Sequence, residues 1–198
     1  MNDTLIDLIR HGEPRGGRAY RGHGIDDPLS EKGWAQMWNA VDGHHDWDAI
    51  VSSPLRRCRD FAEALGERHH LPVEVEHDLR EVGFGRWEGL TPEQVEAAYP
   101  EEYRAFHADP VHARPAGAED LKAFIGRVTT TYRAIVERHA GQRILIVSHA
   151  GVMRAIIAHV LHAEPVGLYR IKVANAGISR IRHGRLGAVL ELHNGRPE

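Results

Sequence analysis

Two short apolar runs, far apart in the chain, each end in a histidine. Residues 5–9 lead into Arg10 and His11, and residues 144–147 lead towards His149. Runs of this length and composition predict buried strands. Because open α/β sheets bind ligands beyond the carboxyl ends of their strands, we expect His11 and His149 to meet in one pocket.

Segments whose apolar residues have the spacing of a helix alternate along the chain with further short apolar runs typical of strands. Ser30 caps one predicted helix, and Ser53 followed by Pro54 opens another. Thr91 and Gln94 form a capping box for a third. The predicted helices lie at 30–41, from 54, from 92, from 100, at 121–139 and at 152–161, and the further strands at 49–51, 72–76, 169–174, 177–182 and 188–193. This order predicts an α/β fold, a three-layer sandwich whose mostly parallel central sheet has antiparallel edge strands.

Length and composition are those of an ordinary globular chain. Its 198 residues suit one domain, residues 1–198, and they are 42% hydrophobic and 27% charged with a formal net charge of −3. That balance gives no electrostatic reason to expect nucleic acid or a membrane surface as a partner. The chain has neither a cationic start before an apolar run nor a stretch that could span a bilayer, so we expect a cytoplasmic protein.

The cysteine and histidine content gives little reason to expect metal or redox chemistry. Cys58 is the only cysteine, and although neighbouring arginines could lower the pKa of its thiol, a lone helical cysteine is usually packed. Among 15 histidines, adjacent pairs such as His69 and His70 point in different directions. His159 and His162 have no carboxylate or cysteine at a recognised spacing. We therefore expect no metal and no cofactor.

Two groups of arginines stand beside the predicted pocket. Arg15, Arg18 and Arg21 lie in a glycine-rich loop at 13–28, and Arg56, Arg57 and Arg59 lie in the first turns of a predicted helix. The helix dipole disfavours cations there by ~0.3–1 kcal/mol each, and a bound phosphate would offset that cost. The alternatives are a solvated basic loop and, on the helix, pairing with Asp60 or Glu63.

A loop rich in glycine and aromatic residues, 79–89, offers a proton donor. Glu81 and Glu88 are the candidates, because walls that exclude water raise the pKa of a carboxyl above ~4.3. An exposed loop carboxylate is the alternative for either one. With two histidines and clustered arginines, such an acid could support phosphoryl transfer by nucleophilic imidazole. The chain has neither the GxxxxGK motif of P-loop enzymes nor the GxSxG motif of serine hydrolases.

Five segments, in order along the chain, match one set of motifs. Residues 10–13 read R-H-G-E, and a D-x-P-L-S-x-x-G segment is resembled by Asp27, Pro28, Leu29, Ser30 and Gly33. Residues 53–57 are similar to an S-x-L-x-R segment, 79–89 to an acidic loop, and 148–151 to a second-histidine motif. Together they resemble the histidine phosphatase superfamily, which has the phosphoglycerate mutase-like fold. The short acidic loop is most similar to the α-ribazole phosphatase-like branch.

The resemblance implies a role for each matching position. His11 would be the nucleophile that becomes a phosphohistidine, and Arg10, Arg57 and His149 would hold the phosphoryl group. Glu81 would protonate the leaving group and then activate water.

Three further positions are candidates for phosphate or substrate contacts. Ala150 would add a backbone N–H. Family members often carry threonine or serine and then an asparagine after R-H-G-E, where this chain has residues 14–17, P-R-G-G. We therefore assign phosphate or substrate contacts to the loop, with Arg21 and Gly22 as candidates beside Arg15 and Arg18.

The implied activity is a metal-independent phosphomonoesterase that acts on a small-molecule phosphate ester through a phosphohistidine. α-Ribazole 5'-phosphate is one candidate substrate. Two alternatives stay open: a phosphoglycerate mutase-type isomerase, and a non-catalytic module that binds a phosphate ligand. The sequence leaves the oligomeric state open, with a homodimer as one alternative.

Overall fold

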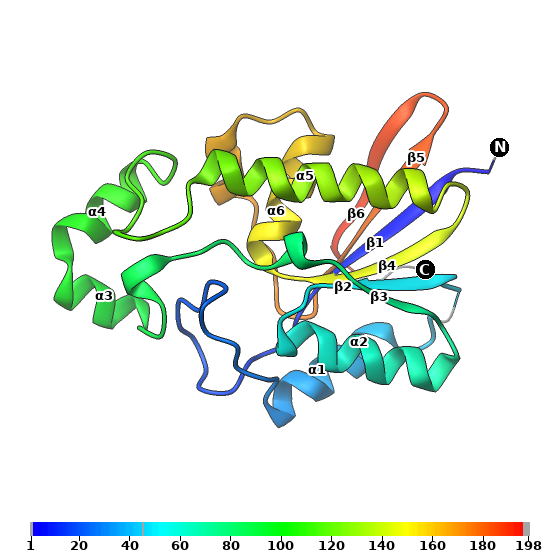
Figure 1. Cartoon of the computed structure of the whole chain (residues 1–198), viewed down its shortest axis with the longest axis horizontal. Helices are drawn as coiled ribbons and strands as arrows, with labels where there is room; N and C mark the ends of the chain where they lie inside the picture. The colour runs from blue at the N-terminus through cyan, green and yellow to red at the C-terminus, as the bar shows by residue number, and fades with distance from the viewer. Residues whose placement is uncertain (1, 45, 196–198) are drawn as a thin grey trace.

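In a computed structural model, which describes residues 2–44 and 46–195, a six-stranded sheet forms the centre of the molecule (Figure 1). In sheet order the strands are β3 (Val73–Val75), β2 (Ala49–Ser52), β4 (Arg143–Ser148), β1 (Thr4–Arg10), β5 (Ile178–Gly184) and β6 (Gly187–Gly195). The first four are parallel, and β5 and β6 form an antiparallel hairpin at one edge. The predicted mostly parallel sheet with antiparallel edge strands is confirmed.

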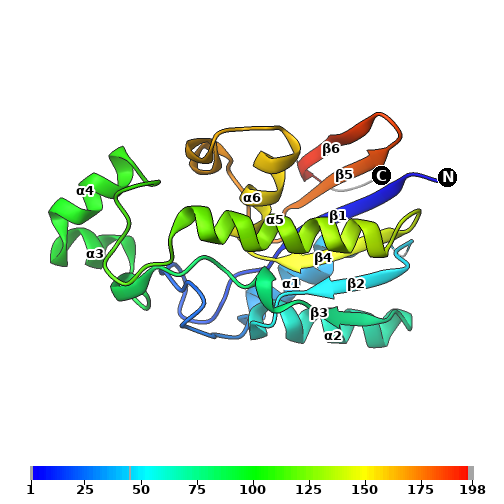
Figure 2. The ribbon, with the colours of Figure 1, turned by 45° about the horizontal axis from the view of Figure 1, so that its top comes forward.

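Helices enclose the sheet on both faces (Figures 1 and 2). The layers consist of α1 (Glu31–Val41) and α2 (Arg56–His69) on one face and of α5 (Leu121–Arg138) and α6 (Ala150–Val160) on the other. Strand β1 shows how the sequence builds both layers. Ile6 and Leu8 pack with α5 and α6, whereas Ile9 packs with α1 and α2. Side chains alternate across a strand, so one apolar run supplies both cores.

Strand pairing places the two histidines together. β1 and β4 are parallel neighbours, with Arg10 opposite Ser148. The next residues, His11 and His149, therefore leave the sheet side by side at its carboxyl edge. The backbone N–H of His11 donates to the carbonyl of Ser148 at 2.9 Å.

Between β3 and α5 the chain leaves the sheet. This excursion contains the 3-10 turns η1 (His77–Leu79) and η2 (Gly85–Trp87) and the helices α3 (Pro92–Ala98) and α4 (Pro100–Ala108). Trp87, Val95 and Phe106 form a separate apolar cluster there. Figure 1 shows α3 and α4 beyond the start of α5, away from the sheet. The capping box of Thr91 and Gln94 is confirmed.

One predicted helix start and one predicted strand are wrong. Helix α2 is present but begins at Arg56 rather than at Pro54, because Leu55 and not Ser53 is its N-cap residue, without a side-chain cap hydrogen bond. Residues 169–174 are not a strand; the segment contains the end of η3 (Pro165–Arg170) and then irregular backbone. Its apolar side chains, such as the buried Val173, pack against the α5–α6 core, which produces a strand-like pattern without a sheet partner. In the described part of the chain, no helix is long and apolar enough to cross a membrane.

Candidate active site

The two histidines lie in contact at the carboxyl edge of the sheet. The ring centroids of His11 and His149 are 5.2 Å apart in an edge arrangement. Both side chains are buried. Burial and the nearby cationic Arg57 hold the pKa of each imidazole well below its ordinary value of 6.5. Both rings are therefore neutral at physiological pH.

A short hydrogen bond fixes the tautomer of His11. Its Nδ1 lies 2.7 Å from the carbonyl oxygen of Gly12. Since a carbonyl only accepts, Nδ1 carries the proton and Nε2 keeps its lone pair. Gly12 is required at this place because a Cβ would overlap the backbone of Gly33 at the start of α1. The neutral ring is thus oriented as a nitrogen nucleophile.

His149 is held from behind by two side chains. Its Nε2 lies 2.7 Å from Ser53 Oγ, which also accepts the N–H of Leu55 at 3.3 Å. Cys58 Sγ lies 3.6 Å from the same nitrogen and donates to the Ser148 carbonyl at 3.3 Å. Burial raises the pKa of the Cys58 thiol, and this effect is larger than the lowering by the nearby positive charges of Arg57 and Arg10. Cys58 is a packed thiol. The sequence placed Ser53 as a helix cap and in the S-x-L-x-R segment but gave it no role at the site, where it contacts His149.

Arg57 separates from the other two arginines of its helix. Its side chain is 1% exposed, and its Nη1 and Nη2 donate to the carbonyls of Ile25 and Gly22 at 2.9 and 2.8 Å. Arg56 and Arg59 instead point outward and lie within ion-pair distance of Asp60, at 3.5 and 4.0 Å. Pairing with acidic side chains of the same helix, the alternative raised by the sequence, therefore holds for Arg56 and Arg59. Arg57 instead lines the cavity.

Arg10 and Arg57 share an unusual feature. Arg10 Nη1 donates to the carbonyl of Val173 at 2.7 Å. The Nε atoms of both arginines are buried without a hydrogen-bond partner among the described residues. Leaving a buried donor unpaired costs about 1–3 kcal/mol. An anion that accepts from both guanidinium groups would remove that cost.

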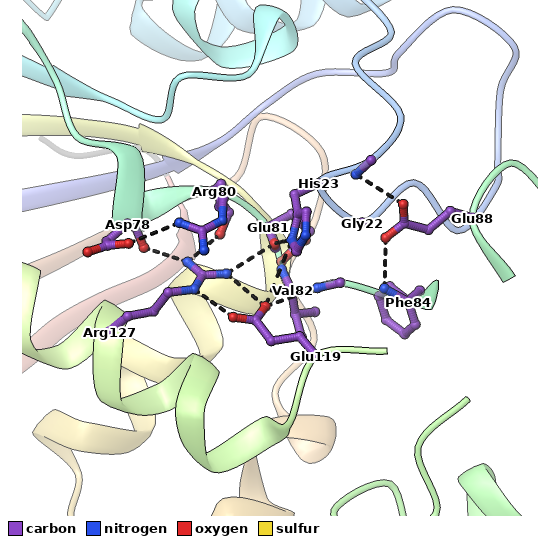
Figure 3. Close-up of polar contacts among 12 residues, drawn as sticks. Gly22, His23, Asp78, Arg80, Glu81, Val82, Phe84, Glu88, Glu119 and Arg127 are labelled. Atoms are coloured by element: carbon purple, nitrogen blue, oxygen red, sulfur yellow. Dashed lines mark hydrogen bonds and ion pairs between the residues drawn. The ribbon is translucent and has the colours of Figure 1, made fainter. Parts of the chain in front are cut away.

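The two candidate acids have different surroundings (Figure 3). Glu81 lines the cavity, and within residues 2–44 and 46–195 its carboxyl oxygens accept only backbone N–H groups, from Val82 at 2.9 Å and Gly151 at 3.2 Å. Glu88 is absent from the cavity wall, and its two oxygens accept from Phe84 at 2.8 Å and Gly24 at 3.0 Å. Glu88 thus ties two loops together, and Glu81 is the carboxyl that a substrate can reach.

The glycine-rich loop is fixed at its base and open at its tip. Arg21 Nε donates to Asp27 at 2.9 Å and Nη2 to the carbonyl of Arg15 at 2.6 Å. Gly22 holds Arg57 through its carbonyl, with a φ of 53° that favours glycine. Arg18 lines the cavity with a side chain that is 81% exposed. Arg15 does not line the cavity, so the loop offers Arg18 and Arg21 to a ligand.

One cavity of about 450 Å³ brings most of these groups together. Its wall includes all the predicted site residues except His149, which contacts His11 from the protein interior: Arg10, His11, Arg21, Gly22, Arg57, Glu81 and Ala150. Ala150 begins α6, whose positive end faces an anion favourably. Among the residues that the structure describes, no group of three or more His, Cys, Asp or Glu could hold a metal ion.

Sequence reasoning missed two polar residues on the cavity wall, Arg154 and Asn175. Arg154 lies in the second turn of α6, with Nε donating to the carbonyl of Ile171 at 2.8 Å. A cation so close to a helix start is the signal that identified Arg57, and it could have identified Arg154. Asn175 precedes Ala176, whose left-handed φ of 53° turns the chain back towards β5. The sequence left residues 175 and 176 as a break between two predicted strands, but no local pattern places Asn175 on the cavity wall.

The sheet, with two histidines at its carboxyl edge, defines a phosphoglycerate mutase-like α/β protein. Residues 6–196 match the histidine phosphatase superfamily (branch 1), and the chain belongs to this family. It is similar to phosphoserine phosphatase 1 of Hydrogenobacter thermophilus, with 31% identity over 191 residues, 94% of this chain and 90% of that protein.

Two further similarities lie in the α-ribazole phosphatase branch. The adenosylcobalamin/alpha-ribazole phosphatase of Escherichia coli is 31% identical over 193 residues, 96% of this chain and 95% of that protein. The crystal structure of the alpha-ribazole phosphatase from Shigella flexneri aligns with a TM-score of 0.86 and 30% identity, covering 97% of this chain and 96% of that one. The predicted family and fold are confirmed, and the relatives support phosphatase activity.

Proposed function

We propose that the protein is a metal-independent phosphomonoesterase that hydrolyses a small cytoplasmic phosphate ester through a phosphohistidine on His11. The observation that carries this proposal is the arrangement at the cavity wall. A neutral imidazole with its Nδ1 proton fixed stands beside Arg10 and Arg57, whose buried Nε donors have no acceptor among the described residues. Phosphate oxygens match the planar fork of arginine.

The first chemical step forms the phosphoenzyme. His11 Nε2 attacks phosphorus while the bond from phosphorus to the ester oxygen breaks and leaves its electron pair on that oxygen. The Glu81 carboxyl gives its proton to the departing oxygen. Arg10, Arg57 and the Ala150 N–H stabilise the charge on the transferring group. The resemblance implied that His149 also holds the phosphoryl group. Because His149 does not line the cavity and its Nε2 lies 2.7 Å from Ser53 Oγ, we assign it instead to support of the His11 ring.

The second step returns the enzyme to its starting state. The Glu81 carboxylate takes a proton from water as the water oxygen bonds to phosphorus. The bond between phosphorus and Nε2 breaks, and its electron pair returns to His11. Inorganic phosphate leaves, and Glu81 is protonated again.

For the substrate we propose α-ribazole 5'-phosphate, supported by the relatives from Escherichia coli and Shigella flexneri. Phosphoserine is the competing substrate, because the relative from Hydrogenobacter thermophilus is a phosphoserine phosphatase at the same 31% identity. A hydrolase fits better than a mutase, because a mutase must keep water from its phosphoenzyme and the tip of the glycine-rich loop is open.

A panel of phosphate esters that includes both compounds tests this function. We expect one ester to be hydrolysed with the highest kcat/KM, and a quenched reaction to contain an acid-labile, base-stable phosphoenzyme. His11→Ala should abolish both. Wild-type hydrolysis by His11→Ala would refute the mechanism. Binding of phosphate esters without turnover of any of them would favour a non-catalytic module.

A further inference from the structure

A group of side chains holds the backbone around Glu81, and we call Arg127, Glu119 and His23 the Glu81 clamp (Figure 3). Arg127 reaches from α5 to the segment that carries Glu81. Its Nη1 donates to the carbonyls of Asp78 at 2.6 Å and Arg80 at 2.9 Å. Its Nη2 donates to the carbonyl of Glu81 at 3.2 Å. One guanidinium therefore fixes three carbonyls within four consecutive residues.

Glu119 fixes Arg127 in turn. Its Oε1 and Oε2 accept from Nε and Nη2 of Arg127 at 2.7 and 2.9 Å, a two-pronged ion pair. Oε2 also accepts the N–H of Gly83 at 3.1 Å. The Arg127 and Glu119 side chains are only 11% and 15% exposed. Burial raises the pKa of Glu119, but hydrogen bonds from Arg127 and Gly83 outweigh it and hold the pKa below its ordinary value. The pair is therefore charged at neutral pH.

His23 joins this clamp to the phosphate side of the cavity. Its Nδ1 lies 3.0 Å from the carbonyl oxygen of Glu81. The adjacent Gly22 accepts Arg57 Nη2 through its own carbonyl at 2.8 Å. Two neighbouring residues of one loop thus touch both the acid segment and the arginine proposed to bind phosphate.

The clamp acts on a carboxyl that has no side-chain partner. In the part of the chain that the structure describes, the Glu81 carboxyl accepts only backbone N–H groups, those of Val82 and, from the start of α6, Gly151. The direction of the carboxyl therefore depends on where its own backbone is held relative to α6. Arg127 fixes the carbonyl of Glu81, and Glu119 fixes the N–H of Gly83.

We propose that Arg127 and Glu119 are positioning residues that aim the Glu81 carboxyl at the leaving oxygen of the substrate. This inference rests on the function proposed above, in which Glu81 is the general acid. A general acid must lie within hydrogen-bond reach of the oxygen that it protonates. A misplacement of about 1 Å is enough to cost about 10²-fold in rate. Neither Arg127 nor Glu119 lines the cavity, so each acts through Glu81.

The test compares two phosphate esters that differ in their need for a proton. Phenyl phosphate releases a basic phenolate, whereas 2,4-dinitrophenyl phosphate releases an anion that needs no protonation. The value of kcat/KM reports phosphoenzyme formation alone, without the later attack of water. Arg127→Lys keeps the charge but cannot span three carbonyls, and Glu119→Gln removes the charged partner while keeping the shape.

We expect either variant to lower kcat/KM for phenyl phosphate by ~10-fold or more and for 2,4-dinitrophenyl phosphate by less than ~3-fold. Arg138→Lys is the matched control, because Arg138 lies on the same helix and pairs with Glu74 and Glu76 at 2.7 and 2.9 Å, outside the cavity wall. It should leave both esters unchanged. If Arg127→Lys unfolds the protein, Glu119→Gln decides the question.

Glu81→Gln separates failure of this inference from failure of the proposed function. If Glu81→Gln shows the selective loss on phenyl phosphate but the clamp variants lower both esters equally, or neither, Glu81 is the acid and the positioning role is wrong. If Glu81→Gln lowers both esters equally, the acid assignment fails and the inference fails with it. Selective loss in Glu81→Gln and in the clamp variants supports both.

Discussion

Arg57→Ala should lower kcat by about 10²–10³-fold, the usual cost, ~2.7–4 kcal/mol, of removing one preorganised donor that meets transition-state charge. The size of this effect follows from the way the Arg57 side chain is held. Arg57 is 1% exposed, and its two terminal nitrogens are committed to Gly22 and Ile25. Each terminal nitrogen keeps a second N–H, and the Nε–H is buried without a partner among the described residues, so the guanidinium still has donors to offer to an anion. The guanidinium is thus held in position before the substrate arrives.

The same substitution should also destabilise the fold, and the assay has to separate the two effects. Loss of Arg57 leaves two carbonyls without their donor, at about 1–3 kcal/mol for each one that water cannot reach. Thermal unfolding gives the folded fraction, and kcat is then calculated per folded enzyme. Arg56→Ala and Arg59→Ala are matched controls from the same helix turns, whose surface ion pairs contribute ~0.2–1 kcal/mol. Equal losses of kcat at all three positions would refute the assignment.

Further predictions concern metal, pH and the fate of the phosphoryl group. Activity should survive EDTA and be inhibited by vanadate; a loss that magnesium or zinc restores would contradict the arginine-based site. Because burial and Arg57 depress the pKa of His11, the nucleophile stays neutral as pH falls through 6.5, so kcat/KM for 2,4-dinitrophenyl phosphate should show no inflection there. An inflection near the ordinary histidine value that follows His11 in NMR titration would count against this. With 2,3-bisphosphoglycerate as primer, 3-phosphoglycerate should give little 2-phosphoglycerate, whereas a preferred ester releases phosphate steadily; robust isomerisation without phosphate would identify a mutase. Glu81→Gln should slow both formation and hydrolysis of the phosphoenzyme, measured by rapid quench, and loss in only one step would mean that another group acts in the other.

The sequence predicts best what local pattern and strand order decide. Two apolar runs ending in His11 and His149 predicted adjacent strand ends, and the parallel β1–β4 pairing confirms it. The cap at Ser30 follows from its local pattern, since its hydroxyl accepts the N–H of Gly33 at 3.0 Å. The strand predicted at 169–174 failed because alternating burial arises against helices as well as in a sheet.

Long-range contacts explain what the sequence could not decide. No local pattern shows whether Glu81 or Glu88 faces the cavity. The difference arises because the Glu88 carboxyl accepts the backbone N–H groups of Gly24 and Phe84. The role of Ser53 depends on a hydrogen bond to His149, 96 residues further along the chain. The role of Arg127 could not be predicted for the same reason. Its partners lie at residues 78–81, and no sequence pattern shows that this loop packs against α5.

The glycine-rich loop has a fixed base and a free tip, and the two parts should differ in how well they tolerate changes of sequence. Tyr20 is paired with Leu90 and Gly89 through its backbone, and residues 21–25 are tied to Asp27, Arg57 and Glu88. In the part of the chain that the structure describes, residues 16–19 are held only by the Gly17 N–H, which donates to the carbonyl of Pro14 at 3.3 Å, and by the exposed Arg18, which lies 3.8 Å from Glu93. We therefore expect insertions, deletions or charge reversals in that tip to alter which leaving group fits while Arg57 stays in place. A library randomised at 16–19 alone should diversify substrate preference without loss of phosphoryl transfer.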